Sequence, residues 1–110
     1  MESIKRQTFQ DFEVVVIGDG APSRTTKIMA DICDNDSRFY YRLFPKSERT
    51  GEHYRDIIIR ESQSDIIAYI CDDDLWLPWH LDWMVTALQT ADFAHSMNYN
   101  VHLDGHIESM

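Results

Sequence analysis

Continuous apolar runs alternate along this sequence with segments in which apolar residues recur every three or four positions. Runs of the first kind occur at residues 14–17 and 66–71, and the aromatic segment 38–44 lies between them. Such runs are typical of strands that are covered on both faces of a parallel sheet. Another strand is expected at residues 92–99. Asp104 and Gly105 then form a hairpin turn signal.

Three segments have the spacing of amphipathic helices. They cover residues 23–34, 51–64 and 78–90. Ser23 is suited to cap the first of them. The resulting order β-α-β-α-β-α-β predicts an α/β fold, in which a mostly parallel open sheet has helices on both faces. A chain of 110 residues is expected to form a single domain.

Acidic residues follow two of the predicted strands. Asp19 comes after the first strand, and Asp72, Asp73 and Asp74 come directly after the run at 66–71. Three adjacent carboxylates repel one another unless water, a cation or basic groups offset their charge. Because strand carboxyl ends meet in one crevice of an open α/β sheet, these acids predict a site for a divalent cation and a phosphate. A solvated acidic loop is the alternative.

The amino-acid composition argues against some classes of binding partner. Ten basic and nineteen acidic residues give a net charge of -9, which argues against a nucleic-acid binder or a protein of anionic membranes. No apolar run approaches the roughly 20 residues that cross a bilayer, and the amino terminus lacks the apolar region of a signal peptide. We therefore expect no membrane span in this chain and a cytoplasmic location, with Cys33 and Cys71 as reduced, buried thiols.

The ordered series of motifs resembles family 2 glycosyltransferases, which have the GT-A fold (Rossmann-like). Residues 7–20 are similar to their Q-T-x-x-D-x-E segment and the strand ending D-D-G-S, and residues 51–60 to the G-x-x-x-A-R-N helix. Residues 64–78 resemble the strand with the D-x-D-type motif, and residues 91–105 the following A-D strand and D-G hairpin. Gly18 departs from the pattern, because an aspartate is usual there.

The resemblance implies a role for each matching acid. Asp19 matches the aspartate that contacts the base or ribose of a sugar nucleotide, and Asp72 matches the position nearest the ribose. Asp73 and Asp74 match the acids that bind Mg²⁺ or Mn²⁺. Arg55 matches an arginine near the phosphates. The implied donor is a nucleotide-diphosphate sugar of the UDP- or GDP-sugar class, and the acceptor is a saccharide or a lipid-linked molecule.

The resemblance also implies that parts of the family's domain lie outside this chain. The family's first strand is expected before Met1, and the catalytic base for inverting hexosyl transfer beyond Met110. Residues 1–110 are thus expected to be a single partial GT-A nucleotide-sugar-binding domain, truncated at both ends. No catalytic residue is assigned to this chain, which is expected to be inactive alone. The absent strand would leave a gap that a homo-oligomer could fill.

Two alternatives of other classes stay open. One is a non-catalytic nucleotide-binding or oligomerising module that retains the fold but lacks the catalytic base. The other is a Mg²⁺-dependent phosphoryl-transfer domain of the receiver type. The latter would need a lysine after a later strand, and no lysine follows Lys46.

Overall fold

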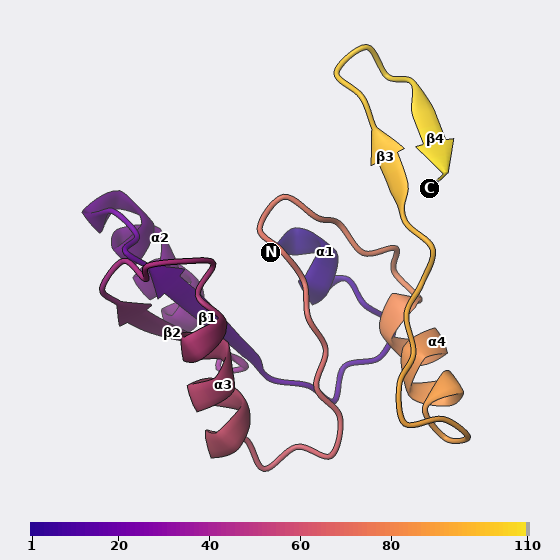
Figure 1. The fold of residues 1–110 in the computed structure, drawn as a ribbon, viewed down its shortest axis with the longest axis horizontal. Coiled ribbons are helices and arrows are strands. Elements are labelled where there is room, and N and C mark those ends of the chain that lie inside the picture. Colours follow the sequence, from indigo (N-terminus) through magenta and orange to yellow (C-terminus); the bar gives the residue numbers. More distant parts are fainter. Residues whose placement is uncertain (110) are drawn as a thin grey trace. The chain divides into compact units, whose positions relative to one another are not determined.

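The computed structural model describes residues 1–109 of the chain. The chain forms two compact units. One is Asp11–Tyr69, and the other combines Met1–Gln10 with Ile70–Met110 (Figure 1). Each unit is described by itself below.

The unit Asp11–Tyr69 is built around a parallel pair of strands. Its elements in chain order are β1 (Val14–Asp19), α2 (Ser23–Asn35), β2 (Phe39–Phe44) and α3 (Glu52–Glu61). The β-branched residues of β1 and the aromatic residues of β2 favour extended backbone. The strands pair in register from Val14 opposite Phe39 to Asp19 opposite Phe44. Their carboxyl ends therefore lie at the same edge, which is the edge that carries Asp19.

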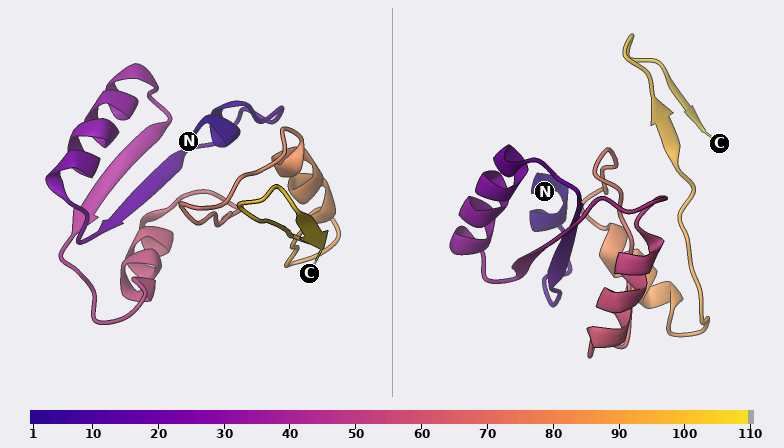
Figure 2. Two further views of the ribbon diagram at one scale, coloured as in Figure 1. Left: turned by 90° about the horizontal axis from the view of Figure 1, so that it is seen from above. Right: turned by 60° about the vertical axis from the view of Figure 1, so that its left-hand side comes forward.

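Helices pack on both strands of this pair. α2 contacts β2 and α3 contacts β1, and Figure 2 shows α2 running alongside the two strands. The buried apolar side chains of the unit are Met29 of α2, 4% exposed, and Phe39 of β2, 2% exposed. At the other end of β2, the ring of Phe44 stacks on Tyr54 of α3 with centroids 4.3 Å apart. This stacking helps to fix the start of α3 beside the end of β2.

The other unit has short helices and a hairpin. α1 (Glu2–Lys5) carries Ile4 and α4 (His80–Ala87) carries Leu81, which are the buried apolar residues described for this unit. β3 (Tyr99–Val101) and β4 (Ile107–Ser109) pair in antiparallel fashion. The predicted turn is confirmed: Gly105 has a φ of 85°, which glycine adopts without a Cβ penalty.

Two predicted strands are wrong. Residues 66–71 have irregular backbone, and of residues 92–99 Tyr99 alone belongs to a strand. A strand is held by the hydrogen bonds of a neighbour, and an apolar run needs layers on both faces. Ile66 and Ile67 are instead 41% and 42% exposed. The α/β class is confirmed in its coarse form, as helices with a two-stranded parallel sheet, and the larger open sheet is not formed by the described residues.

The helices predicted from spacing are confirmed, two of them with shorter bounds. α2 matches the predicted 23–34, whereas α3 and α4 each begin later and end earlier than 51–64 and 78–90. Within the described part of the chain, none of the helices has the length and apolar character needed to cross a bilayer.

Candidate functional site

Asp72, Asp73 and Asp74, called the acid turn below, lie in a tight turn rather than at the end of a strand. The turn is closed by the amide of Asp74, which donates a hydrogen bond to the carbonyl of Cys71 at 3.3 Å. All three acids are exposed, and so is Cys71, whose predicted burial is therefore wrong. One ligand atom each from Cys71, Asp73 and Asp74 lies within 4.8 Å of the other two.

This arrangement fits a hard divalent cation through its carboxylates. Mg²⁺ and Mn²⁺ are bound by oxygen ligands, often one or two carboxylates together with phosphate oxygens. Asp73 and Asp74 supply such oxygens, whereas the thiol of Cys71 is a softer ligand that suits other metals. Asp72 is not a member of the group. The two residues that the sequence predicts as metal ligands are thus the two carboxylates that the turn brings together.

Gln7 holds the backbone that follows the acid turn. Its side chain is 2% exposed and donates hydrogen bonds to the carbonyls of Leu77 at 2.8 Å and Ser3 at 2.9 Å. Its Oε1 accepts a hydrogen bond from the amide of Leu81 at 3.0 Å. Leu81 lies in the first turn of α4, where backbone amides have no partner within the helix. One buried amide side chain therefore ties α1 to the start of α4.

Asp19, in the other unit, is held by the loop that follows β2. Its Oδ1 accepts a hydrogen bond from the amide of Ser47 at 2.5 Å, and its Oδ2 accepts from Ser47 Oγ and from Lys46 Nζ, both at 2.7 Å. The hydrogen bond from Lys46, followed by those from Ser47, lowers the pKa of Asp19 to about 2. Asp19 is therefore an ionised acceptor at neutral pH.

Two glycines allow this loop to come close to Asp19. Gly20 has a φ of 67°, and a Cβ at this position would lie 2.7 Å from the Cβ of Lys46. Gly51 has a φ of 76°, and its Cβ would lie 3.4 Å from Asp19 Oδ2. A side chain at Gly20 would thus clash with the loop as well as strain the backbone.

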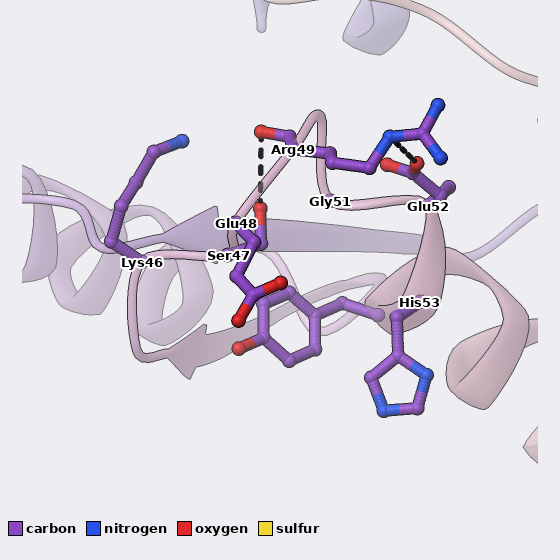
Figure 3. Close-up of a pocket in the computed structure, with 8 residues that line it drawn as sticks. Lys46, Ser47, Glu48, Arg49, Gly51, Glu52 and His53 are labelled. Atoms are coloured by element: carbon purple, nitrogen blue, oxygen red, sulfur yellow. Dashed lines mark hydrogen bonds and ion pairs between the residues drawn. The ribbon is translucent and has the colours of Figure 1, made fainter.

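A shallow pocket of about 360 Å³ lies next to this contact. Figure 3 shows Ser47 Oγ facing the carbonyl of Arg49 at 3.3 Å, and the guanidinium of Arg49 paired with Glu52 at 3.1 Å. The pocket is made by the β2–α3 loop and the first turn of α3. Its lining residues are Lys46, Ser47, Glu48, Arg49, Gly51, Glu52, His53 and Tyr54.

Arg55 follows this pocket on α3. Its side chain is exposed, and its amide donates to the carbonyl of Gly51 at 3.2 Å in the first turn of the helix. Asp19 and Arg55 belong to the unit Asp11–Tyr69, and the acid turn belongs to the other unit. The predicted meeting of Asp19 with the acid turn in one crevice stays a prediction.

Lys46 and Ser47 were missed as functional candidates, although the sequence contains a signal for them. They follow the second predicted strand, and the carboxyl ends of neighbouring parallel strands share an edge of the sheet. Residues after that strand should therefore lie near Asp19. Gln7 was missed because its burial depends on contacts with residues some seventy positions away.

Gly18 leaves room for the side chain of Tyr41, which lies beside it on β2. A Cβ at Gly18 would lie 2.9 Å from Cζ of Tyr41, so the Tyr41 ring occupies the space that a side chain would need. Gly18 pairs with Leu43 in the register, which places Tyr41 diagonally across on the same face. An aspartate at position 18 would therefore require the ring of Tyr41 to move.

Known proteins are similar to this chain over most of its length. The model of Glycosyl transferase family 2 matches residues 1–100. The chain is 29% identical over 105 residues to the "Uncharacterized glycosyltransferase YwdF" of Bacillus subtilis (strain 168), covering 87% of this chain and 34% of that protein. It is 22% identical to the "Uncharacterized glycosyltransferase alr2836" of Nostoc sp. (strain PCC 7120 / SAG 25.82 / UTEX 2576), covering 96% of this chain and 32% of that protein.

A third relative has a more specific name. The chain is 32% identical over 76 residues to the "Teichoic acid poly(glycerol phosphate) polymerase" of Staphylococcus epidermidis (strain ATCC 35984 / DSM 28319 / BCRC 17069 / CCUG 31568 / BM 3577 / RP62A), covering 67% of this chain and 10% of that protein. No solved structure matches the chain significantly.

The match over nearly the whole chain defines the class of protein. The chain belongs to glycosyl transferase family 2. It spans about a third or less of the length of the curated relatives named above.

Proposed function

We propose that this chain binds a nucleotide-diphosphate sugar through a divalent cation, as the donor-binding part of a glycosyltransferase. The observation that carries the proposal is the acid turn, where Asp73 and Asp74 offer oxygens within 4.8 Å of each other. The family resemblance of the sequence, which implies that these two residues bind the cation, supports the proposal, and the chain belongs to that family. The finer fold expected for residues 1–110, a partial GT-A domain, is part of the same proposal.

Each acid has a separate role in this proposal. Asp73 and Asp74 hold Mg²⁺ or Mn²⁺, Asp72 binds near the ribose, and Asp19 accepts hydrogen bonds from the nucleoside. Arg55 contributes positive charge near the phosphates. The cation, when bound, stabilises the negative charge that develops on the leaving nucleoside diphosphate. The low pKa of Asp19, caused first by its hydrogen bond from Lys46, supports its role as a charged acceptor.

The transfer of the sugar to an acceptor requires residues beyond this chain, so this step is proposed for a longer protein. We propose inverting transfer of a hexosyl group, in the cytoplasm, to a hydroxyl of a saccharide or lipid-linked acceptor. The carboxylate that deprotonates this hydroxyl is expected beyond Met110. This chain would then supply donor binding rather than the catalytic base.

Calorimetric titration with UDP- and GDP-sugars, each with and without Mn²⁺, tests this function. We expect binding that requires the cation and is lost in Asp73→Asn. Asp92→Asn is the matched control, because Asp92 is another exposed acid of the same unit, and it should bind as the wild type does. Sugar-nucleotide binding of equal affinity with and without Mn²⁺, or no binding at all, would contradict the proposed function.

The second candidate, a non-catalytic module that oligomerises, is favoured by the β3–β4 hairpin. Val101 and Ile107 pair across the strands, and Tyr99 lies two residues from Val101 on the same face. Their exposed fractions are 72%, 59% and 64%. A two-stranded hairpin is only marginally stable alone. Light scattering measures the oligomeric state. A homo-oligomer that Val101→Lys dissociates, in a chain that binds no nucleotide, would favour this candidate.

A further inference from the structure

We propose that Ser47 is a positioning residue that fixes the carboxylate of Asp19 for a nucleoside. In the same proposal, the nucleoside displaces Lys46 and donates its own hydrogen bonds to the carboxylate oxygen that Lys46 contacts. The inference rests on the proposed function, because it assigns the partners of the same Asp19. It adds the selective chemistry of that contact: the ligand must present N–H or O–H donors, as a nucleobase imide or a ribose does.

Ser47 donates a hydrogen bond to each oxygen of the Asp19 carboxylate. Its amide donates to Oδ1 at 2.5 Å and its hydroxyl to Oδ2 at 2.7 Å. Two donors on one residue fix the plane of the carboxylate as well as its charge. The hydroxyl has a single hydrogen, and its distance to Asp19 is shorter than the 3.3 Å to the carbonyl of Arg49. The hydrogen therefore goes to Asp19.

Lys46 contacts the same carboxylate in a different way. Its Nζ lies 2.7 Å from Oδ2, but the lysine side chain is 68% exposed whereas that of Asp19 is 20% exposed. An exposed lysine pair contributes little free energy, and the long side chain gains rotamer freedom when it is released. An incoming donor group can therefore displace Lys46. It cannot displace the amide of Ser47 without moving the loop.

The loop itself is held in place. The amide of Gly20 donates to the carbonyl of Phe44 at 2.9 Å, and Tyr54 Oη donates to the carbonyl of Pro45 at 2.9 Å. Lys46 packs so closely on Gly20 that a Cβ would not fit between them. Ser47 therefore presents its donors to Asp19 from a fixed backbone, which is what a positioning residue requires.

An ionised carboxylate has about four lone-pair sites. The protein's own donors use three of them, namely two from Ser47 and one from Lys46. Release of Lys46 leaves two sites for the ligand and keeps the two hydrogen bonds from Ser47. Because a carboxylate only accepts, the nucleoside must supply the donors.

The test measures the dissociation constant of UDP in the presence of Mn²⁺ for four variants of the full chain. Ser47→Ala should weaken binding by about tenfold or more, since it removes a hydrogen bond to a charged group. Ser47→Thr keeps the hydroxyl and should restore wild-type affinity. Lys46→Met should tighten binding, because the competing cation is gone. Asp19→Asn tests the proposed function itself and should weaken binding strongly.

Carboxyl NMR adds a readout that a general loss of packing would not give. Its signal is the titration of Asp19, which faces Lys46 and Ser47 of the loop and Gly51 before α3. Ser47→Ala should raise the pKa of Asp19 from about 2, and Ser47→Thr should leave it low.

The outcomes separate the two proposals. If Asp19→Asn weakens UDP binding but Ser47→Ala binds like the wild type, the positioning role of Ser47 is wrong and the proposed function stands. If Lys46→Met loses binding, Lys46 contacts the ligand instead of yielding to it, and its displacement is wrong. If the wild-type chain does not bind UDP with Mn²⁺, the proposed function fails and this inference fails with it.

Discussion

The amide of Leu81 donates a buried hydrogen bond to Oε1 of Gln7, at 3.0 Å and across 74 positions of sequence. The same side chain donates to the carbonyl of Leu77, three residues after the acid turn. A residue near the amino terminus therefore holds the backbone between the acid turn and α4. Gln7 begins the Q-T motif of the family, and this contact gives that position a physical role.

Replacing Gln7 with alanine should destabilise this unit. The change leaves the Leu81 amide and the Leu77 carbonyl without their side-chain partner, and an unpaired buried polar group costs about 1–3 kcal/mol. Urea unfolding followed by circular dichroism measures the free energy of unfolding. Gln89→Ala is the control, because Gln89 is exposed, and it should change that free energy by less than about 0.5 kcal/mol. Equal effects of the two substitutions would contradict the role given to Gln7.

Restoring the aspartate usual in the family at position 18 should destabilise the chain. The new side chain would overlap the ring of Tyr41, and overpacking costs about 1–3 kcal/mol. Gly18→Asp combined with Tyr41→Ala should be less destabilised than the sum of the two single variants, because the ring that clashes has been removed. An additive double-mutant cycle would show that Gly18 and Tyr41 do not compete for space.

The low pKa of Asp19 predicts an acid dependence of stability. Its hydrogen bonds from Lys46 and then Ser47 lower the folded pKa to about 2 from 3.8. The stabilisation is therefore present above pH 3.8 and is lost as the pH falls from there towards 2. Urea midpoints measured across this window should fall more steeply for the wild type than for Asp19→Asn. Asp31→Asn, an exposed acid of α2, should retain the wild-type slope.

Manganese should stabilise the chain through two carboxylates and not through the thiol. A free concentration of 100 times the dissociation constant adds about 2.7 kcal/mol to the free energy of unfolding when the ion binds the folded state alone. Cys71→Ser should keep most of this gain, whereas Asp73→Asn and Asp74→Asn should each lose it. Loss of the gain in Cys71→Ser alone would make the thiol a ligand and point to a softer metal.

The elements that the sequence predicts correctly depend on local pattern. The β-branched run of β1, the aromatic residues of β2 and the helical spacing of α2 act within a few residues, and so does the turn at Gly105. The strand expected at residues 66–71 depends on partners instead. Its apolar composition describes a buried environment, and Ile66 and Ile67 do not have one here. Strand formation at this place is decided by long-range pairing, which composition does not encode.

The candidate site also has one part that the sequence predicts and one part that depends on long-range contacts. Asp73 and Asp74 are adjacent in sequence, so a turn is enough to bring their oxygens together, and this was predictable. The contact between Asp19 and Ser47 joins the end of β1 to the β2–α3 loop, and it follows from the parallel pairing of β1 and β2 combined with the close approach that Gly20 permits. The parallel sheet was predicted, but the side-chain partner of Asp19 depends on the geometry of the loop.

In the proposed function, a cation on the acid turn holds a diphosphate, and the nucleoside of the same ligand binds Asp19. Paramagnetic broadening of amide NMR signals by Mn²⁺ tests it most directly. With Mn²⁺ alone, the signals of Asp73 and Asp74 should broaden, and when UDP is added the signals of Asp19 and Gly20 should broaden as well. Broadening that stays away from Asp73 and Asp74, or that leaves Asp19 unchanged when UDP is bound, would contradict the account.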